Sequence, residues 1–186
     1  MTEITEMTEE KRREEAVYAC LDSLGISYET HHHSAIFTTA DAEEHGYSYP
    51  GFNVKNLVIK DRKTEKYYMV ILEDHDRMDF KAYKAITGWS KRASFADNED
   101  LMEHLGVSAG SCSVFGLIND KQKAITVVLS PAIAAAGEGE QINFHPNVNT
   151  ATVSFTIGAM NQFLDWAGNP VIRPAELELQ SEAKGE

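Results

Sequence analysis

Two polar residues stand inside an apolar, β-prone run of the sequence, where a buried strand would carry aliphatic side chains. Lys55 and Asn56 interrupt the run formed by Val54 and residues 57–59. A lysine at the start of a strand can hold a phosphate group or a developing oxyanion, because its ammonium supplies positive charge at a fixed place. The pair is therefore a candidate catalytic site, and a plain surface lysine is the alternative reading.

Two loops carry groups that could complete such a site. Residues 110–116 are rich in glycine and serine ahead of an apolar run, and residues 145–150 gather histidine, proline, asparagine and threonine into a turn. Small residues let a ligand approach the backbone, whose N–H groups are hydrogen-bond donors. Either loop on its own could equally be an ordinary turn.

The sequence lacks the motifs of several other classes of enzyme. It contains no Gly-x-Ser-x-Gly elbow, no phosphate-binding loop and no His-Glu-x-x-His motif. His31, His32 and His33 are adjacent, and neighbouring strand residues point to opposite faces, so we interpret them as a solvated run and not as one metal site. Cys112 is interpreted as a small buried residue, with a cysteine nucleophile as the alternative.

Together, three segments resemble the motifs of the YbaK/prolyl-tRNA-synthetase-associated editing family. Residues 55–61 (KNLVIKD) are similar to the lysine strand of that family, residues 110–119 (GSCSVFGLIN) to its glycine loop, and residues 144–152 (FHPNVNTAT) to its closing motif. Their order and spacing also match, and residues 35–38 (AIFT) resemble the upstream strand end. The resemblance covers roughly residues 10–170, and within the family it is greatest to the freestanding deacylases of alanyl-tRNA(Pro), the ProX or PrdX type.

This resemblance implies a hydrolase that removes a small mischarged amino acid, alanine in the first place, from tRNA(Pro). It implies water as the nucleophile, positioned or activated with help from the free ribose hydroxyl of the substrate, so that the protein contributes orientation and electrostatics. It implies neither a metal nor an organic cofactor. Two alternatives are editing of another small amino acid, such as serine or cysteine, and a non-catalytic module that binds a tRNA end or a synthetase.

The resemblance also assigns roles to single residues. Lys55 would hold the phosphate region of the terminal adenosine or the substrate carbonyl, and Asn56 would hydrogen-bond near the ester, so these two are the predicted catalytic residues. The predicted substrate-binding residues are Phe37, Thr38, Gly110, Ser111, Ser113, Val114, His145 and Asn149.

Within that group the implied roles differ. Backbone donors around Gly110 and Ser111 would fix the aminoacyl end, and His145 would shape the wall or orient the terminal nucleotide. Phe37 and Val114 would limit the size of the pocket. Val114 stands where the family usually has proline, which would fix φ and remove a donor. This departure bears on amino-acid preference more than on hydrolysis.

The elements that must position these residues follow from hydrophobic spacing and capping residues. Apolar residues at three- and four-residue spacing, with Thr or Asp caps, predict helices at 8–24, 38–44, 79–87 and 97–105, and a last one from 156 to a stop at Gly168. β-prone runs predict strands, some joined as hairpins, at 26–31, 54–60, 66–73, 113–118, 124–129, 142–145 and 152–155. This pattern predicts an α+β fold: a single domain with a mixed, mostly antiparallel sheet and surrounding helices.

The length and composition agree with one globular domain. The chain has 186 residues, of which 42% are hydrophobic and 25% charged. We expect a flexible N-terminus over residues 1–9, the editing domain over 10–172 and a polar tail over 173–186. Two scattered cysteines make neither a disulfide framework nor a zinc site, and there is no apolar span or secretory signal, so we expect a cytoplasmic protein away from membranes.

The net charge of −12 makes the whole chain a poor nucleic-acid binder. Residues 51–95 are the exception, because ten basic and six acidic side chains give them +4, against −16 for the remainder. The predicted partner is therefore an aminoacyl-tRNA that is touched at its acceptor end. A prolyl-tRNA synthetase is a second candidate partner, and the oligomeric state is left open.

Overall fold

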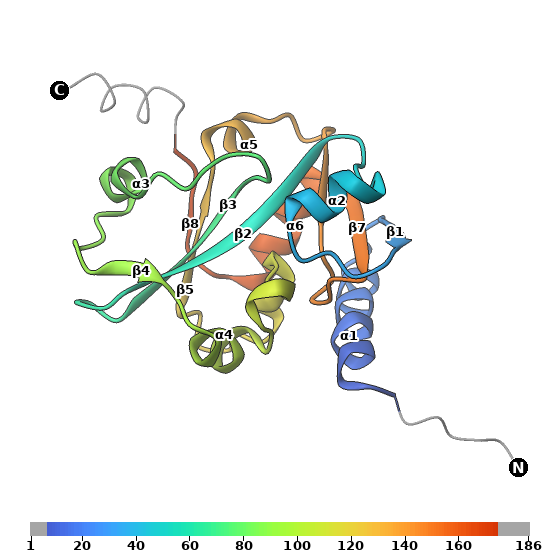
Figure 1. Ribbon diagram of the computed structural model, residues 1–186, viewed down its shortest axis with the longest axis horizontal. Helices are drawn as coiled ribbons and strands as arrows, with labels where there is room; N and C mark the ends of the chain where they lie inside the picture. Colours follow the sequence, from blue (N-terminus) through green and yellow to red (C-terminus); the bar gives the residue numbers. More distant parts are fainter. Residues whose placement is uncertain (1–6, 175–186) are drawn as a thin grey trace, which may run out of the picture.

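Helices and strands alternate around one mixed sheet in the computed structural model, which describes residues 7–174 (Figure 1). Residues 1–6 and 175–186, which hold most of the predicted N-terminal stretch and tail, lie outside the described part of the chain. The strands are β1 (Glu29–His32), β2 (Phe52–Asp61), β3 (Lys66–Glu73), β4 (Ala93–Phe95), β5 (Ile125–Leu129), β6 (Gln141–Phe144), β7 (Ala151–Thr156) and β8 (Val171–Ile172). The α-helices are α1 (Glu9–Ser23), α2 (Thr39–His45), α3 (Phe80–Thr87), α4 (Asn98–Leu105), α5 (Pro131–Ala135) and α6 (Ile157–Ala167), and the 3-10 helices are η1 (Ala109–Ser111) and η2 (Val114–Ile118).

The described strands form an eight-stranded sheet in the order β1-β7-β6-β2-β3-β5-β8, with β4 paired to β2 beside this path. Four of the pairings are antiparallel and three are parallel. The predicted fold class, α+β with a mixed and mostly antiparallel sheet, is therefore confirmed.

Strand β2 joins the two halves of this sheet. Along one edge it pairs with β3, from Val54 opposite Glu73 to the end of the strand. Along the other edge, only Phe52 and Asn53 pair with β6, and residues 59–61 pair with β4. Between these two pairings, residues 54–57 face no strand of the described chain on that edge. The predicted catalytic residues of β2 lie in this opening.

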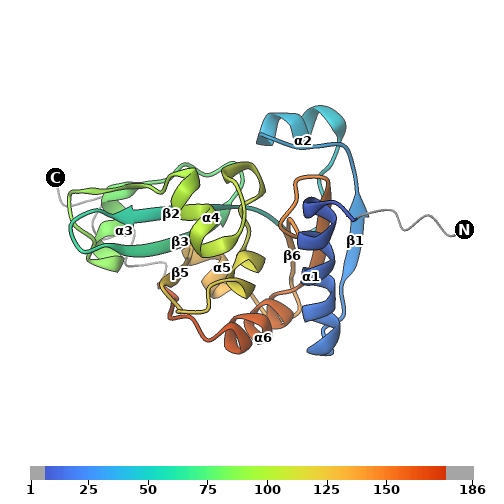
Figure 2. The ribbon, with the colours of Figure 1, turned by 90° about the horizontal axis from the view of Figure 1, so that it is seen from below.

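The helices begin where the capping residues predict. Thr38 and Asp97 each form a capping box, in which the cap side chain and the carboxylate three residues later bond to each other's backbone N–H groups. Thr8, Asp79 and Thr156 cap α1, α3 and α6. In Figure 2, α2 stands above the sheet and α6 below it. The five predicted helices are confirmed to within one or two residues.

Two hydrophobic cores bury the two faces of the sheet. The larger contains four phenylalanine rings, Phe115, Phe144, Phe155 and Phe163, whose contacting centroids are 5.3–5.9 Å apart. Such edge-to-face aromatic contacts add specific geometry to apolar burial. The smaller core lies under α3, around Trp89. Both cores fix β2, which carries one side chain into each of them in turn.

The predicted strand at 113–118 is wrong, because Val114–Ile118 form η2. The Ser113 hydroxyl accepts the N–H of Phe115, and Gly116 packs so tightly that an added Cβ would lie 2.9 Å from the Leu105 Cβ. A short continuous apolar run does not distinguish a buried strand from a buried helix. The predicted hairpin to 124–129 is also wrong, since β5 pairs in parallel with β3.

Smaller differences concern the edges of the sheet. The strand predicted at 26–31 lies later, as β1. The short elements β4, α5 and β8 were not predicted, because two to five residues carry too little periodicity to be recognised. Within residues 7–174, the helices are all too short or too polar to cross a membrane.

Candidate active site

A cavity of about 200 Å³ lies beside the open edge of β2. Its walls come from segments far apart in the sequence: the start of α2, β2 itself, η1, and β6 with the connection to β7. The polar side chains among its lining residues are Thr38, Tyr47, Tyr49, Asn53, Lys55, Asn56, Asp74, Asn143, His145 and Thr152. The three motif segments of the sequence therefore meet in one site.

The ammonium of Lys55 is held in a fixed place at this cavity. Its Nζ donates one hydrogen bond to the backbone oxygen of Asp74 at 3.0 Å and another to the backbone oxygen of Asp76. An ammonium has three N–H donors, and the third has no partner among the described residues. A positive charge is thus preorganised beside the cavity with one donor left for a ligand, which is the arrangement that electrostatic catalysis needs.

Asn56 offers the complementary group. Its Oδ1 is buried and has no hydrogen-bond partner among the described residues, and Asn56 is one of the residues that line the cavity. Successive strand residues point to opposite faces, so the cavity wraps around the free edge of β2 to reach both Lys55 and Asn56. An unpaired buried acceptor costs about 1–3 kcal/mol. The site therefore favours a ligand that brings a hydrogen-bond donor to this atom.

Asn143 and Asn53 fix the floor of the cavity where β6 meets β2. Asn143 is 4% exposed, and its Nδ2 donates to the backbone oxygens of Pro50 at 3.0 Å and Phe52 at 3.1 Å. Asn53 donates in turn to the backbone oxygen of Tyr49 at 2.9 Å. The sequence reading missed both asparagines. The available signal was a polar residue inside an apolar strand, the same signal that identified Lys55.

His145 follows the last residue of β6 in the cavity wall, and its imidazole ring is neutral. Its Nδ1 lies 2.9 Å from the backbone oxygen of Ala151, so the proton is on Nδ1 and Nε2 is left as an acceptor. Burial lowers the pKa of His145, the bond to Ala151 opposes this, and the neighbouring His33 lowers it further. The His33 ring lies 6.1 Å from that of His145 and places Nε2 2.9 Å from the Thr152 hydroxyl.

Acidification should therefore cost stability through His145. The unfolded pKa of histidine is about 6.5, so the stabilisation due to a neutral ring is fully present above that pH and is lost as the pH falls toward the lowered folded value. We expect the free energy of unfolding to fall more between about pH 7 and pH 5 in the wild type than in a His145→Gln variant. Urea denaturation at both pH values measures this, and an identical pH dependence in the two proteins would contradict it.

Five of the ten predicted site residues line the cavity, namely Thr38, Lys55, Asn56, Gly110 and His145. Thr38 does so at the N-cap of α2, and Gly110 from the middle of η1. These five come from four separate segments, and the fold brings them together.

The other five predicted residues lie around the cavity and not in its wall. Phe37 is 74% exposed beside the glycine loop, so that a Cβ added to Gly110 would lie 3.9 Å from its ring. Ser113 caps η2, and Val114 is fully buried in the larger core. The backbone oxygen of Asn149 accepts the N–H of Ile36, and the remaining residue, at position 111, ends η1.

The model of the aminoacyl-tRNA editing domain family matches residues 33–163 of this chain. That range includes every predicted site residue and the complete lining of the cavity. The chain belongs to the aminoacyl-tRNA editing domain family. The family predicted from the three sequence segments is therefore confirmed.

The relatives of this editing domain have names that refer to prolyl-tRNA editing or to prolyl-tRNA synthetase. Prolyl-tRNA editing protein ProX of Acetoanaerobium sticklandii is 29% identical over 155 residues, which cover 83% of this chain and 92% of the relative. Prolyl-tRNA synthetase associated domain-containing protein 1 of Mus musculus is 30% identical over 137 residues, or 73% and 80% of the two chains. A solved structure described as a candidate trans-editing enzyme for prolyl tRNA synthetase has a TM-score of 0.63 at 18% identity, covering 88% of this chain and 97% of its own. That last likeness concerns the fold alone.

The thiol in the cavity of this editing domain is unsuited to nucleophilic attack. Burial raises the pKa of Cys112 to about 12, so the thiol stays protonated at neutral pH. We expect Cys112→Ala and Cys112→Ser to keep most of the deacylation rate, with no covalent adduct visible by mass spectrometry. Loss of activity in both variants, together with a trapped aminoacyl thioester in the wild type, would overturn water as the nucleophile.

One group of potential metal ligands lies near the editing cavity. Glu73, His75 and Asp76 place their ligand atoms within 4.8 Å of one another at the end of β3. The hydrogen bond that His75 donates to the Asp74 carboxylate raises the pKa of His75, which favours the protonated ring that cannot bind a metal. We assign no metal to this largely exposed group.

Proposed function

We propose that this protein is a trans-editing deacylase, which hydrolyses the ester between a small mischarged amino acid, alanine in the first place, and tRNA(Pro). Membership of the aminoacyl-tRNA editing domain family supports the reaction. The printed name of the ProX relative, a prolyl-tRNA editing protein, supports the tRNA. The activity belongs in the cytoplasm, where charged tRNA is used, and a prolyl-tRNA synthetase is the partner we propose for delivery.

The observation that carries this proposal is that Lys55 and Asn56, neighbours on β2, both line a small cavity. Lys55 keeps one ammonium N–H for a ligand, and Asn56 keeps a buried acceptor. An aminoacyl ester has the matching groups: a carbonyl oxygen that becomes negative during attack, and an α-ammonium and a ribose hydroxyl that donate. We assign the carbonyl or the adjacent phosphate to Lys55 and one of the two donors to Asn56.

Hydrolysis then needs no protein nucleophile. Water adds to the ester carbonyl, the bond between the carbonyl carbon and the ribose oxygen breaks, and the amino acid and the free ribose hydroxyl are released. The Lys55 ammonium is already held in place by two backbone carbonyls, so little reorganisation accompanies the attack. The substrate's second ribose hydroxyl and the neutral Nε2 of His145 are the groups we propose to orient the water.

The size of the cavity supports a small amino acid. About 200 Å³ is below the range of roughly 300–1,000 Å³ that is usual for sites of drug-sized ligands. It corresponds to about six or seven liquid waters, enough for a small aminoacyl group and an attacking water. Editing by a second site is needed because a prolyl pocket rejects a smaller side chain by only about 1–3 kcal/mol.

Two alternative functions make different predictions for a deacylation assay. Serine or cysteine could be the edited amino acid, since Cys112 and the backbone of η1 can hydrogen-bond a small polar side chain. A non-catalytic tRNA-end or synthetase-binding module is the other. A departure from the family's proline at Val114 would favour such a module if it altered the site, but Val114 is buried in the core and is not part of the cavity wall. This position favours hydrolysis over mere binding.

A deacylation assay over a panel of charged tRNAs tests the proposal. Alanyl-, seryl-, cysteinyl- and prolyl-tRNA(Pro), with alanyl-tRNA(Ala) as the tRNA control, are each incubated with the protein. We expect fast release of alanine from tRNA(Pro) and a stable prolyl ester. Faster release of serine or cysteine would reassign the amino acid, and release from none of them would leave a binding module.

Recognition should be confined to the acceptor end, because the chain outside residues 51–95 is strongly acidic. The candidate contacts in that segment are Lys55, Lys60, Lys63, Lys81 and Lys84, and of these Lys60 is engaged with Asp100 at 2.9 Å. Two or three phosphate contacts predict a log–log salt slope of about −1.4 to −2.1 for a single-stranded end. The Kd of a deacylation-resistant aminoacyl-tRNA is measured across a salt series beside a short acceptor-stem mimic. A several-fold steeper slope, with much weaker binding of the mimic, would mean that the protein also binds the body of the tRNA, and would contradict recognition of the acceptor end alone.

A further inference from the structure

The aromatic side chain of Phe95 packs against the protein and is also partly exposed to solvent. It is 52% exposed at the end of β4. Phe80, the first residue of α3, packs edge-to-face against it with centroids 5.3 Å apart, and Phe80 in turn contacts Trp89 at 5.9 Å. The register of β4 places Phe95 opposite Ile59 of β2. A large apolar surface is therefore held rigid at the protein surface, where burial by a partner would be favourable.

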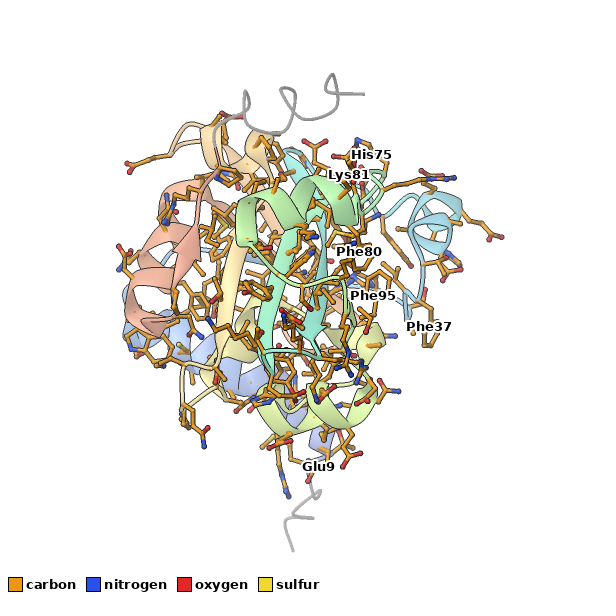
Figure 3. The ribbon with its side chains drawn as sticks, turned by 90° about the vertical axis from the view of Figure 1, so that its left-hand side faces the viewer. Glu9, Phe37, His75, Phe80, Lys81 and Phe95 are labelled. Atoms are coloured by element: carbon orange, nitrogen blue, oxygen red, sulfur yellow. The ribbon has the colours of Figure 1, made fainter. Side chains whose placement is uncertain are left out.

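This ring lies along the same edge of β2 as the cavity. Lys55 comes four residues before Ile59, so a strand rise of about 3.4 Å per residue puts roughly 14 Å between them. Figure 3 shows Phe95 on one face of the molecule, between Phe80 and the exposed Phe37. The ring and the cavity thus lie along the same edge of β2.

The segment after Phe95 is tied to the glycine loop. The Oδ1 of Asn98, the first residue of α4, accepts the N–H of Ala109 at 3.2 Å. Ala109 lines the cavity and begins η1. The end of β4 and the cavity wall are therefore positioned together, and a ligand that reaches from one to the other meets a prearranged surface.

The strand that ends in Phe95 is bordered by a positive charge. The exposed Arg62 donates from Nε to the hydroxyl of Ser94 at 3.0 Å, and its backbone N–H bonds to the oxygen of Arg92 at 3.4 Å. One guanidinium group, that of Arg62, thus borders β4 on its Ser94 side, within the segment whose net charge is +4. An exposed flat ring with cations around it is the chemistry that binds single-stranded nucleic acid, through base stacking and phosphate contacts.

We propose that Phe95 is a stacking platform for an unpaired base of the tRNA 3′ end, upstream of the terminal adenosine whose ester enters the cavity. This inference rests on the proposed function. Stacked nucleotides repeat at about 3.4 Å per strand, so the roughly 14 Å along β2 from Lys55 to Ile59, the residue opposite Phe95, is the span of about four of them. The guanidinium of Arg62, the net positive charge of residues 51–95 and the hydrogen bond that ties Asn98 to Ala109 of the cavity wall favour a nucleic acid over a protein as the occupant.

The test compares Phe95→Ala, Phe95→Leu and Phe95→Trp with the wild type in binding a deacylation-resistant aminoacyl-tRNA. Loss of one stacked base should weaken binding about 5- to 150-fold in the alanine and leucine variants, and tryptophan should retain it. Leucine keeps apolar packing against Phe80 but has no ring, so it separates stacking from misfolding. The matched control is Trp166→Ala, which removes a 48% exposed aromatic from α6, on the other side of the sheet from α2 (Figure 2).

Two further readouts isolate the upstream base. An aminoacyl ester of adenosine alone has no upstream nucleotide, so its hydrolysis should be the same in Phe95→Ala and the wild type. The indole fluorescence of Phe95→Trp should be quenched by a single-stranded oligonucleotide that carries the tRNA 3′-terminal sequence.

Unchanged tRNA affinity in Phe95→Ala, an equal loss on the adenosine ester, or an equal loss in Trp166→Ala would overturn the stacking proposal. So would a selective loss of synthetase binding, which would mark a protein-docking ring. Failure of the wild type to deacylate any charged tRNA would instead overturn the proposed function, and the binding comparison would still test the platform.

Discussion

Replacement of Lys55 by alanine should lower kcat/KM for deacylation about 10²-fold or more, the scale expected when one preorganised oxyanion-type contact is lost. The Lys55 ammonium is held by the backbone oxygens of Asp74 and Asp76 and keeps one donor for the substrate. Its removal also releases two partly solvated carbonyls, which water can bond. The free energy of unfolding should therefore change by no more than about 1 kcal/mol. Steady-state kinetics on the preferred charged tRNA and urea denaturation measure the two effects.

Two further substitutions separate catalysis from loop support. Lys55→Arg keeps the charge, but a planar guanidinium cannot reproduce a compact ammonium between two carbonyls, so it should restore only part of the rate. Lys63→Ala, in the exposed turn of the same hairpin, removes the same charge away from the cavity and should leave kcat almost unchanged. A Lys55→Ala protein that unfolds readily while its folded fraction keeps full specific activity would make this lysine structural.

The parts of the fold that the sequence predicts well are those with local causes. Thr38 and Asp97 cap helices through atoms within three residues of themselves, so both helix starts are visible in the sequence. The segment at 113–118 has no such cause. Its conformation depends on the contact of Gly116 with Leu105, eleven positions away. It also depends on the parallel pairing of β5 with β3, which no turn residue in the sequence indicates.

The candidate site shows the same division. Lys55 and Asn56 could be found because they interrupt an apolar run, and the structure places both at the cavity. Asn53 and Asn143 act as a pair across a junction of β2 and β6, and a single sequence does not reveal which distant strands meet. Phe95 became visible only through its exposure next to a packed strand. Chemistry carried by one residue type is therefore easier to predict than chemistry created by contact between segments.

The second large effect is expected at Gly51, where β2 begins. Gly51 has φ +89°, and a Cβ added to it would lie 2.1 Å from the backbone oxygen of Gln141, a contact that only a shift of the backbone can relieve. We expect Gly51→Ala to lower the free energy of unfolding by about 2–5 kcal/mol, since a positive φ costs an alanine about 1–2 kcal/mol and loss of buried hydrogen bonds adds about 1–3 kcal/mol. Urea denaturation measures this loss.

The substitution should also affect activity, because Gly51 lies at the narrowest connection of the sheet. Only Phe52 and Asn53 pair with β6, and Asn143 bonds to the backbone oxygens on both sides of Gly51. Pushing the strands apart there should open the cavity floor, so the folded fraction of Gly51→Ala should also lose deacylation rate when assayed at low temperature. Gly139→Ala is the matched control in the loop before β6: its added Cβ meets nothing within 4 Å, and we expect a change within about 0.5 kcal/mol. If Gly51→Ala were as stable and as active as Gly139→Ala, the junction would not be tight, and the asparagine floor of the cavity would not depend on it.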